Sequence, residues 1–353
     1  MVKRRKLVTI KDVAKEAGVS LSTVSFALSN PERVAAQTRK HVLRIARELG
    51  YSRIKKTKQT GNIGLISDDY HNLLFGEFYD WVVFGILEEL KKRNINVLID
   101  STGNDPECFP KMIIKNKVDG VLFLGKSSRD LIFIAQQKGI PLVLVGHPIP
   151  DLELPTVVPD GRSGALQAIN HLIEQGHQKI AIITGEPKFD PITAERLEGY
   201  RFALNKAGLK EDEKYIAEAD YGKPETAIEA TNKLLNLADP PTAIFCTSDS
   251  LAYRSYEAIK AKGLKIPGDV SIVGFDEITA PAYAQLPKPE LTTIQVDRRQ
   301  MGESSVEILF DIIKNPKQTT YRYTLPVKLV AKESSGKTKT FVFSRLTSST
   351  PPP

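Results

Sequence analysis

The stretch that most constrains this chain runs from residue 9 to residue 29, TIKDVAKEAGVSLSTVSFALS. Thr9 stands three residues before Asp12, which is the spacing of a capping box at the start of a helix. Apolar residues then recur at the i, i+3, i+4, i+7 spacing of one helix face: Ile10, Val13, Ala14 and Ala17. Gly18 suits the left-handed conformation in which many helices end, and Ser20 is the next N-cap candidate. The stretch therefore predicts two short helices joined by a three-residue Gly-Val-Ser turn.

A third helix is predicted to brace the first two. Asn30-Pro31 stops the second helix, and a new apolar face starts at about Ala36 and ends at Gly50. Ala35 has no side-chain oxygen with which to cap this helix, so its start is weakly capped. Two short helices with a tight turn and a bracing third helix form a helix-turn-helix, which presents its second helix to a DNA major groove. An ordinary small helical bundle is the alternative.

Charge favours the DNA-binding interpretation. Residues 1–60 hold 15 Lys and Arg against 4 Asp and Glu, whereas the whole chain holds 49 against 42, a net charge of +7. The chain beyond residue 60 is therefore slightly acidic. DNA-binding surfaces need positive charge because the neutralisation of phosphates supplies most of the nonspecific affinity. A merely solvated charged face would not explain why the basic surplus stops near residue 60.

The segment IKDVAKEAGVSLSTVSFALS resembles the opening of the lactose/galactose repressor (LacI/GalR) family of bacterial transcription regulators, and the resemblance extends to about Ser334. It implies an all-α head and a periplasmic-binding-protein-like α/β core, in which two lobes with parallel sheets surround a cleft. It also implies a cytoplasmic, nucleoid-associated repressor of carbohydrate-metabolism genes, switched by a small effector in that cleft. A sugar or sugar derivative is the first candidate effector, and a nucleobase or nucleoside is the second. Because one head of this size binds weakly, we expect a homodimer on a pseudo-palindromic operator.

From residue 62 onward, short apolar strands alternate with amphipathic helices, which predicts parallel sheets covered by helices on both faces. The predicted strands are Ile63–Ser67, Asn96–Asp100, Gly120–Leu124, Leu142–Gly146, Lys179–Thr184, Tyr215–Glu218, Ala243–Thr247 and Ser271–Phe275. The predicted helices are Phe78–Arg93, Pro106–Asn116, Ser128–Lys138, Ser163–Gln175, Pro191–Ala207, Glu225–Leu237 and Asp249–Lys262. Two groups of about four units fit two similar lobes, with a break near Val158–Ser163.

The family resemblance adds two later chain crossings, near Leu291 and Thr320. Helix Asp297–Lys314 would return to the first lobe and strand Tyr321–Val330 to the second. The expected domains are thus a head over residues 1–51, a basic linker over 52–62 and a core over 63–336. Within the core, lobe 1 would take about 63–160 and 292–320, and lobe 2 about 161–291 and 321–336.

The linker and the C-terminal tail depart from the family pattern. The linker, YSRIKKTKQTGN, lacks the Pro-Asn, the Ala-Arg pair and the leucine with which relatives form a hinge helix that enters the minor groove. It favours a flexible tether that contacts phosphates through basic side chains: Arg53, Lys55, Lys56 and Lys58. Residues 337–353 are rich in Ser and Thr and end in three prolines, so we expect a disordered tail without a tetramer-forming coiled coil.

The outer face of the second helix would read the DNA. By family position, four hydroxyl side chains would hydrogen-bond phosphates: Thr9, Ser20, Thr23 and Ser25. Three other side chains would meet base edges: Leu21, Ser22 and Phe26. Capping alone is the alternative for the hydroxyl set. No charged side chain lies between Ser20 and Asn30, so this helix lacks Arg–guanine pairs, and we expect thymine methyl groups under Leu21 and Phe26.

Candidate effector contacts fall beyond the carboxyl ends of the predicted strands, where ligands bind open α/β sheets. By family position they are Phe78, Tyr79, Arg196, Tyr221, Ser248 and Asp276, with Arg298 and His147 as weaker rim candidates. Arginine and aspartate can fork onto vicinal hydroxyls, and aromatic rings stack on a sugar face. Five of these residues have a structural alternative. Ser248 and Asp276 could be helix caps, the aromatic pair could be core, and Arg196 could form a surface ion pair.

Other function classes find little support. Gly120–Ser127, GVLFLGKS, satisfies the P-loop pattern, but its middle residues are the body of a strand and not a phosphate-cradling turn. No metal-ligand spacing and no GxSxG motif occurs, so we expect no catalytic residue, metal or cofactor. Cys108 and Cys246 are expected to be buried, reduced thiols. No apolar run would cross a membrane, and no signal sequence is evident. The competing class is a small-molecule binding protein with a vestigial head.

Overall fold

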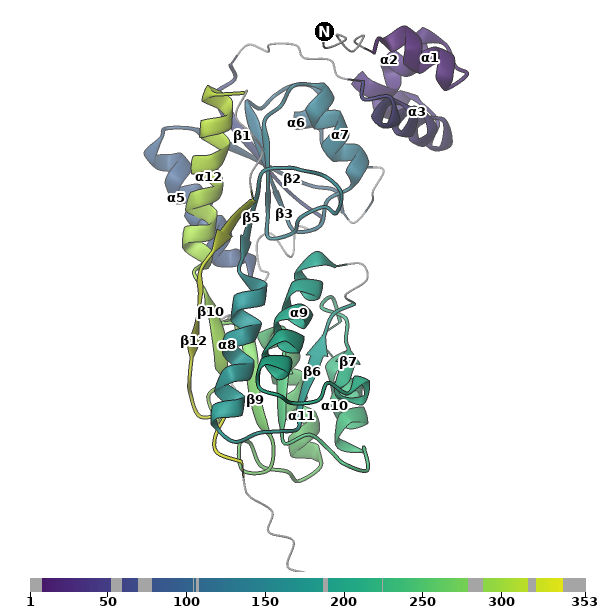
Figure 1. Cartoon of the computed structure of the whole chain (residues 1–353). Helices are drawn as coiled ribbons and strands as arrows, with labels where there is room; N and C mark the ends of the chain where they lie inside the picture. The colour runs from purple at the N-terminus through teal and green to yellow at the C-terminus, as the bar shows by residue number, and fades with distance from the viewer. Residues whose placement is uncertain are drawn as a thin grey trace, which may run out of the picture. The chain divides into compact units, whose positions relative to one another are not determined.

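The computed structural model describes residues 8–51, 59–68, 78–103, 105, 108–186, 190–223, 225–278, 288–316 and 322–338 of the chain (Figure 1). The chain forms two compact units. The first unit combines the N-terminal head (residues up to 51) with lobe 1 (59–160 and 296–327), and the second unit is lobe 2 (161–295 and 328 onward). The linker residues Arg53, Lys55, Lys56 and Lys58 lie outside the described residues, as does the tail from residue 339 onward.

The head has the three helices that the caps and apolar stripes predict: α1 (Ile10–Glu16), α2 (Leu21–Ser29) and α3 (Ala36–Glu48), with a short 3-10 turn, η1 (Pro31–Arg33). The capping box is present, because the Thr9 N–H donates to Asp12 Oδ2 at 2.8 Å and the Asp12 N–H to Thr9 Oγ1 at 3.4 Å. Ser20 Oγ accepts the Thr23 N–H at 3.0 Å, and Gly18 has a φ of +63° in the turn. The start of α3 receives no side-chain cap, as expected.

Lobe 1 is a six-stranded parallel sheet in the order β11-β5-β4-β3-β1-β2. Its strands are β1 (Asn62–Ser67), β2 (Asn96–Ser101), β3 (Gly120–Leu124), β4 (Leu142–Val145), β5 (Thr156–Pro159) and β11 (Arg322–Leu325). Its helices are α5 (Tyr79–Lys92), α6 (Lys111–Ile114), α7 (Arg129–Gln137) and α12 (Arg298–Lys314). Leu122 and Leu124 of β3 join the core formed with α5 and α12. Val121 and Phe123 join the core formed with α6 and α7, so helices cover both faces of the sheet (Figure 1).

Lobe 2 has a second six-stranded sheet, in the order β12-β10-β9-β8-β6-β7, and its pairs from β10 to β7 are parallel. Its strands are β6 (Ile180–Thr184), β7 (Ile216–Glu218), β8 (Ala243–Cys246), β9 (Ser271–Asp276), β10 (Thr292–Val296) and β12 (Val327–Val330). Its helices are α8 (Gly161–Glu174), α9 (Pro191–Lys206), the 3-10 turn η2 (Glu213–Tyr215), α10 (Thr226–Leu235) and α11 (Asp249–Ala261). The alternation of strands and helices is therefore the one expected.

Two of the chain crossings differ from expectation. The first falls after Asp160, within the expected break, but the others lie at residues 295–296 and 327–328 rather than near Leu291 and Thr320. The segment 292–296 is β10 of lobe 2. The expected single strand 321–330 is two strands, β11 in lobe 1 and β12 in lobe 2. Pro326 separates them, because proline cannot donate to a strand ladder and so ends the pairing.

In each lobe, one pair of helices packs with its backbones in contact at glycines. A Cβ on Gly85 of α5 would overlap the Arg299 carbonyl group of α12, and one on Gly302 of α12 would overlap the Val82 carbonyl group of α5. In lobe 2, a Cβ on Gly199 of α9 would overlap the backbone of α8. Only glycine lets the two helices of each pair approach this closely.

His177 ties the body of lobe 2 to its C-terminal segment. The side chain is buried, with Nε2 3.0 Å from the Gly336 carbonyl oxygen and 3.1 Å from Ser271 Oγ. Its Nδ1 lies 2.8 Å from Thr242 Oγ1. Because a carbonyl oxygen only accepts, Nε2 carries the proton, and in the neutral ring Nδ1 accepts the Thr242 hydroxyl. Burial lowers the pKa of His177, against the opposing effect of the Gly336 hydrogen bond.

We expect lobe 2 to lose stability as the pH falls below about 6.5, the pKa of histidine in an unfolded chain. The folded-state pKa of His177 is lowered, so the unfolded chain binds more protons below pH ~6.5, and the loss continues until the folded-state pKa is passed. One such histidine changes the free energy of unfolding by up to ~1.4 kcal/mol per pH unit. Calorimetry of the wild type and of His177→Gln at several pH values measures this change. The same pH dependence in both proteins would show that His177 is not its source.

Candidate DNA-binding and effector-binding sites

The outer face of α2 presents two large apolar side chains to solvent. Leu21 is 45% exposed and Phe26 is 40% exposed. The opposite face of α2 supplies Val24, Ala27 and Leu28 to the core of the head, which fixes the rotation of the helix. In a major groove, such apolar side chains can contact the methyl group of thymine. The rotation of α2 therefore leaves Leu21 and Phe26 available to base edges.

Hydroxyl groups surround the start of α2. Ser20 Oγ lies 2.7 Å from Ser22 Oγ and 2.8 Å from Thr23 Oγ1, and it also accepts the Thr23 N–H. Thr9 is exposed at the start of α1, and Ser25 is half-buried on α2. Helix capping is therefore one role of the Thr9 and Ser20 side chains. A hydroxyl group has both a donor and acceptor lone pairs, so a capping residue can still donate to a phosphate.

In lobe 2, a buried polar cluster surrounds Arg196 of α9, at the carboxyl ends of β8 and β9. Arg196 is only 5% exposed, which rules out the surface ion pair. Its guanidinium donates to the Thr247 carbonyl oxygen, lies 3.5 Å from Asp276 Oδ1 and stacks on the Phe275 ring, 3.7 Å from its centroid. Its Nε has no hydrogen-bond partner among the described residues. The group is thus held flat and retains a donor, which forked binding to hydroxyls requires.

Asp276 has an unusual backbone conformation at the end of β9. Its φ is +112° and that of Glu277 is +52°, a region that few residues other than glycine adopt. Buried Asp249 holds this turn, because it accepts the Ile278 N–H at 2.8 Å and the Thr293 hydroxyl at 2.6 Å. Burial raises the pKa of Asp249 well above its ordinary range, and the neighbouring charge of Asp276 raises it further. Strain and buried like charges of this kind cluster at functional sites.

Tyr221 and Ser248 lie at the same end of lobe 2, but their side chains make different contacts. The Tyr221 hydroxyl is 2.7 Å from Thr247 Oγ1, and its ring packs so closely on Gly185 that a Cβ there would lie 2.5 Å from it. Tyr221 is half-buried, so part of this residue remains accessible to a ligand. Ser248 caps α11 by accepting the Leu251 N–H at 3.3 Å. Its structural alternative, a helix cap, thus accounts for Ser248.

In lobe 1, Phe78 and Tyr79 stand at the start of α5 with their rings edge to face, 5.2 Å apart between centroids. Both rings are partly buried against the lobe 1 core. The Tyr79 hydroxyl reaches the carboxyl ends of β3 and β4, where it would lie 3.5 Å from a Cβ on Gly125 and 2.6 Å from one on Gly146. The aromatic pair thus stands at the edge of the sheet where ligands bind α/β folds.

Arg298 has a structural role that is visible in lobe 1. It is buried, and its Nη1 lies 2.9 Å from Asp80 Oδ1, so it ties the start of α12 to the start of α5. His147 follows β4 and is partly buried. The ion pair accounts for Arg298 without a ligand, which weakens its candidacy as an effector contact.

Two family models match the chain. The model of the bacterial regulatory proteins, lacI family, matches residues 9–53, and that of the periplasmic binding protein-like domain matches residues 169–335. The HTH-type transcriptional repressor CytR of Escherichia coli (strain K12) is 37% identical over 318 residues, which cover 88% of this chain and 91% of that protein. The chain belongs to the LacI family of bacterial regulatory proteins. The family resemblance of residues 10–29 is thereby confirmed.

Other members of the LacI family match over similar lengths. The ribose operon repressor of Haemophilus influenzae is 33% identical over 336 residues, which cover 93% of this chain and 98% of that protein. The solved structure of a transcriptional regulator CelR-cellobiose complex matches with a TM-score of 0.73 and 30% identity, covering 93% of this chain and all of that one. The expected fold class, an all-α head with a periplasmic-binding-protein-like core, is confirmed.

Three polar residues of the lobe 2 cluster were not predicted from the sequence: Thr184, Thr247 and Asp249. Thr184 ends β6, and its buried hydroxyl has no partner among the described residues. Thr247 directly follows β8. The rule that ligands bind beyond strand ends could have found both threonines. Asp249 depends on Thr293, 44 residues further along the chain, so no local pattern marks its role.

The structure also shows where the motif and residue types typical of other function classes lie. The segment that matches the P-loop pattern, Gly120–Ser127, begins with strand β3. All five residues of β3 are buried, so the middle of the pattern is a strand, as expected. Within the described ranges, no three His, Cys, Asp or Glu side chains gather closely enough to hold a metal ion. Cys246 is buried and its pKa is raised to about 12 by that burial, but Cys108 is only half-buried, contrary to expectation. None of the helices that can be described combines the length and apolarity of a membrane span.

Proposed function

We propose that this protein is a transcriptional repressor of carbohydrate-metabolism genes whose operator affinity is switched by a small sugar or sugar derivative. The observation that carries the proposal is the exposed recognition helix. Leu21 and Phe26 point outward from a segment of 60 residues that holds 15 basic and 4 acidic side chains. A vestigial head would not need two large exposed apolar side chains on one helix. On DNA, both would gain burial against bases while phosphates neutralise the surrounding charge.

Lobe 2 supports a ligand that carries hydroxyl groups. Arg196 supplies donors and Asp276 supplies an acceptor 3.5 Å away, which suits two adjacent hydroxyls. In lobe 1, Phe78 and Tyr79 add aromatic faces of the kind that stack on sugar rings. Two of the relatives are a ribose operon repressor and a regulator in complex with cellobiose. Nucleosides also carry vicinal hydroxyls, so they form the second arm of a ligand panel.

The ligand would act by binding one conformation of the protein better than the other. Such a ligand shifts operator affinity only by its differential affinity for the two conformations, commonly about 1–3 kcal/mol. A thermal-shift screen of sugars and nucleosides identifies the class, because a ligand that binds only the folded protein raises its melting temperature. Stabilisation by nucleosides but by no sugar would replace the sugar proposal with its alternative.

A homodimer would supply the second head that a pseudo-palindromic operator needs. Helix α5 exposes a run of large apolar side chains on lobe 1: Trp81, Phe84 and Leu87. The Trp81 and Phe84 rings pack edge to face, 5.4 Å apart between centroids. Contiguous exposed aromatic residues of this kind are typical of surfaces that bind another protein. We place the dimer contact on this face of α5.

Replacing Phe26 with alanine is expected to weaken operator binding by about 5- to 150-fold, the effect of losing about 1–3 kcal/mol of base contact. Nonspecific binding should change little, because Phe26 carries no charge and phosphates dominate that term. Gel retardation with operator fragments and with random duplex, at low and high salt, measures both affinities. Circular dichroism checks that the head remains folded.

Ser25→Ala is the matched control, because Ser25 lies on the same helix and is expected to contact a phosphate. That variant should weaken all sequences by a similar factor. If Phe26→Ala also weakened operator and random DNA equally, Phe26 would not read bases. If the wild type retarded no promoter fragment at any salt concentration, the regulator proposal itself would fail.

A further inference from the structure

A basic loop, which contains the short helix α6 and the turn after it, lies at one end of lobe 1. Between β2 and β3, residues 111–118 read KMIIKNKV. Met112, Ile113 and Val118 are buried and anchor the loop in the core of the lobe. The three lysines of this loop, Lys111, Lys115 and Lys117, are exposed. The buried anchors thus hold three positive charges outward within seven residues that contain no acidic side chain.

Backbone hydrogen bonds fix the shape of this loop. The Lys115 N–H donates to the Lys111 carbonyl oxygen at 2.9 Å, and the Lys117 N–H donates to the Met112 carbonyl oxygen at 2.8 Å. None of the three lysine ammonium groups has an ion-pair or hydrogen-bond partner among the described residues. Elsewhere in lobe 1, by contrast, Lys92 is paired with Glu89 at 3.0 Å. The loop therefore holds positive charge that the described part of the protein does not neutralise.

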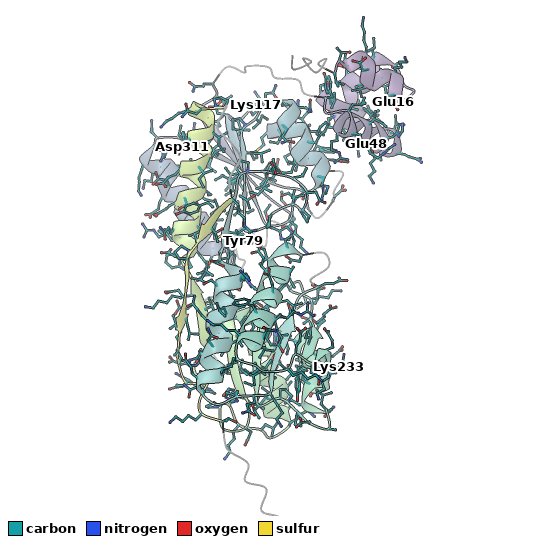
Figure 2. The ribbon with its side chains drawn as sticks, viewed as in Figure 1. Glu16, Glu48, Tyr79, Lys117, Lys233 and Asp311 are labelled. Atoms are coloured by element: carbon teal, nitrogen blue, oxygen red, sulfur yellow. The ribbon has the colours of Figure 1, made fainter. Side chains whose placement is uncertain are left out.

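The tether from the head enters lobe 1 beside these lysines. The Asp119 carboxylate accepts the Thr60 N–H and the Gly61 N–H, both at 2.7 Å, and so clamps the end of the tether. Asn62 Nδ2 donates to the Lys117 carbonyl oxygen at 3.0 Å. Figure 2 shows Lys117 at one end of lobe 1 and Tyr79 at the other end of that lobe. The basic loop and the attachment of the head thus share one end of lobe 1.

The length of the tether limits how far bound DNA can be from this loop. The nine peptide steps from Tyr51 to Thr60 span at most about 32 Å, whatever path they take. We propose that the loop formed by residues 111–117 is a second DNA-contact surface, which binds backbone phosphates beside the half-site that the head reads. The proposal rests on the DNA-binding function and adds a contact outside the helix-turn-helix. Lysine is suited to this role because its ammonium group binds a phosphate without a fixed geometry.

A purely structural role for the lysines is the alternative. Cations near the ends of helices interact favourably with the helix dipole, and α6 ends at Ile114, next to Lys115. That effect falls off within one turn, and α6 has only four residues, so it accounts for Lys115 better than for Lys117. The two roles differ in a measurable way, because only phosphate binding makes the lysines affect how DNA affinity depends on salt.

The test replaces Lys111, Lys115 and Lys117 together with glutamine in the full-length protein. The plot of log K against log salt has a negative slope. Each phosphate that is no longer neutralised should make this slope shallower by about 0.9, so the loss of three phosphate contacts makes it shallower by about 2.7 per subunit. The DNA is a duplex selected from a random pool by the wild type, in a minimal form of about two helical turns and in a form about one turn longer on each side. The matched control carries three exposed lysines of lobe 2 changed to glutamine: Lys206, Lys210 and Lys233.

We expect the lobe 1 variant to show a shallower slope and about tenfold or more weaker binding on the longer duplex, a smaller change on the minimal duplex, and an unchanged ratio of specific to nonspecific binding. The lobe 2 control should bind both duplexes as the wild type does. An unchanged slope in the lobe 1 variant, or an equal change in the control, would overturn the proposal. A wild type without any sequence preference would instead refute the regulator function, and the slopes on random duplex would still decide the role of the loop.

Discussion

Replacing Gly302 with valine is expected to destabilise lobe 1 by at least the ~1–3 kcal/mol that overpacking typically costs. The reason is the contact between α5 and α12, where a Cβ on Gly302 would overlap the Val82 carbonyl group. A flexible side chain could rotate away from such an overlap, but a helix backbone can only move together with its whole helix. An overlap with a helix backbone belongs at the upper end of that range, so about 3 kcal/mol at about 2–4 °C per kcal/mol should lower the melting temperature by about 6–12 °C. Scanning calorimetry should show this fall.

Glu307→Val on the same helix is the control for this prediction. Glu307 is exposed, so valine there has the same unfavourable helix propensity without the overlap. The control should therefore melt within about 2 °C of the wild type, because surface substitutions usually change stability by less than ~0.5 kcal/mol. Equal melting temperatures of the two variants would show that α5 and α12 can move apart at Gly302 without a loss of stability.

Asp276→Asn is expected to weaken effector binding by about 10- to 150-fold. The carboxylate is placed to accept hydrogen bonds from ligand hydroxyls beside Arg196, and hydrogen bonds to charged groups contribute about 1.5–3 kcal/mol. Binding of the ligand-free protein to its operator should not change. Titration calorimetry with the sugar found in the thermal-shift screen, followed by gel retardation with and without that sugar, measures both quantities.

The same substitution should destabilise the ligand-free protein, because the buried Arg196 guanidinium loses its ionic partner and breaking a buried ion pair typically costs about 3–5 kcal/mol. Asp276 places a second negative charge next to buried Asp249, whose pKa is raised by burial and by that charge. Removing one charge relieves this repulsion and so offsets part of that loss of stability. Glu277→Gln is the matched control, since it removes one negative charge from the adjacent residue. Equal loss of ligand affinity in both variants would point to general electrostatics rather than to contact by Asp276.

Local patterns predicted those parts of the fold that depend on neighbouring residues. The capping box of Thr9 and Asp12, the turn at Gly18 and the parallel strands all follow from spacing within a few residues. The errors lie where short segments carry weak signals. β5 is only Thr156–Pro159 and was missed, and the helix expected over residues 106–116 is described only as α6, Lys111–Ile114. Prolines interrupt both segments, so neither had the uninterrupted periodicity that a prediction needs.

The candidate sites were predictable to different degrees. Arg196 and Asp276 were predicted as effector contacts by family position, and the structure brings the two side chains together in lobe 2. The support beneath them was not predictable, because Asp249 contacts Thr293 and the Ile278 N–H from distant parts of the chain. The glycine contact between α5 and α12 joins residues 217 positions apart, Gly85 and Gly302, and no spacing rule reaches that far. Such roles appear only once the tertiary packing is known.

The glycine contacts within each lobe also affect how the binding of an effector changes the affinity of the protein for its operator. Helices whose main chains touch have no room to slide or turn past each other, so each lobe resists deformation from within. Little of the free energy of binding is then absorbed by bending a lobe. The chain passes from one unit to the other near residues 160, 296 and 327, and we expect any bending to occur at these three places. Changes at those passages should retune the response of the protein while its contacts with effector and operator stay as they are.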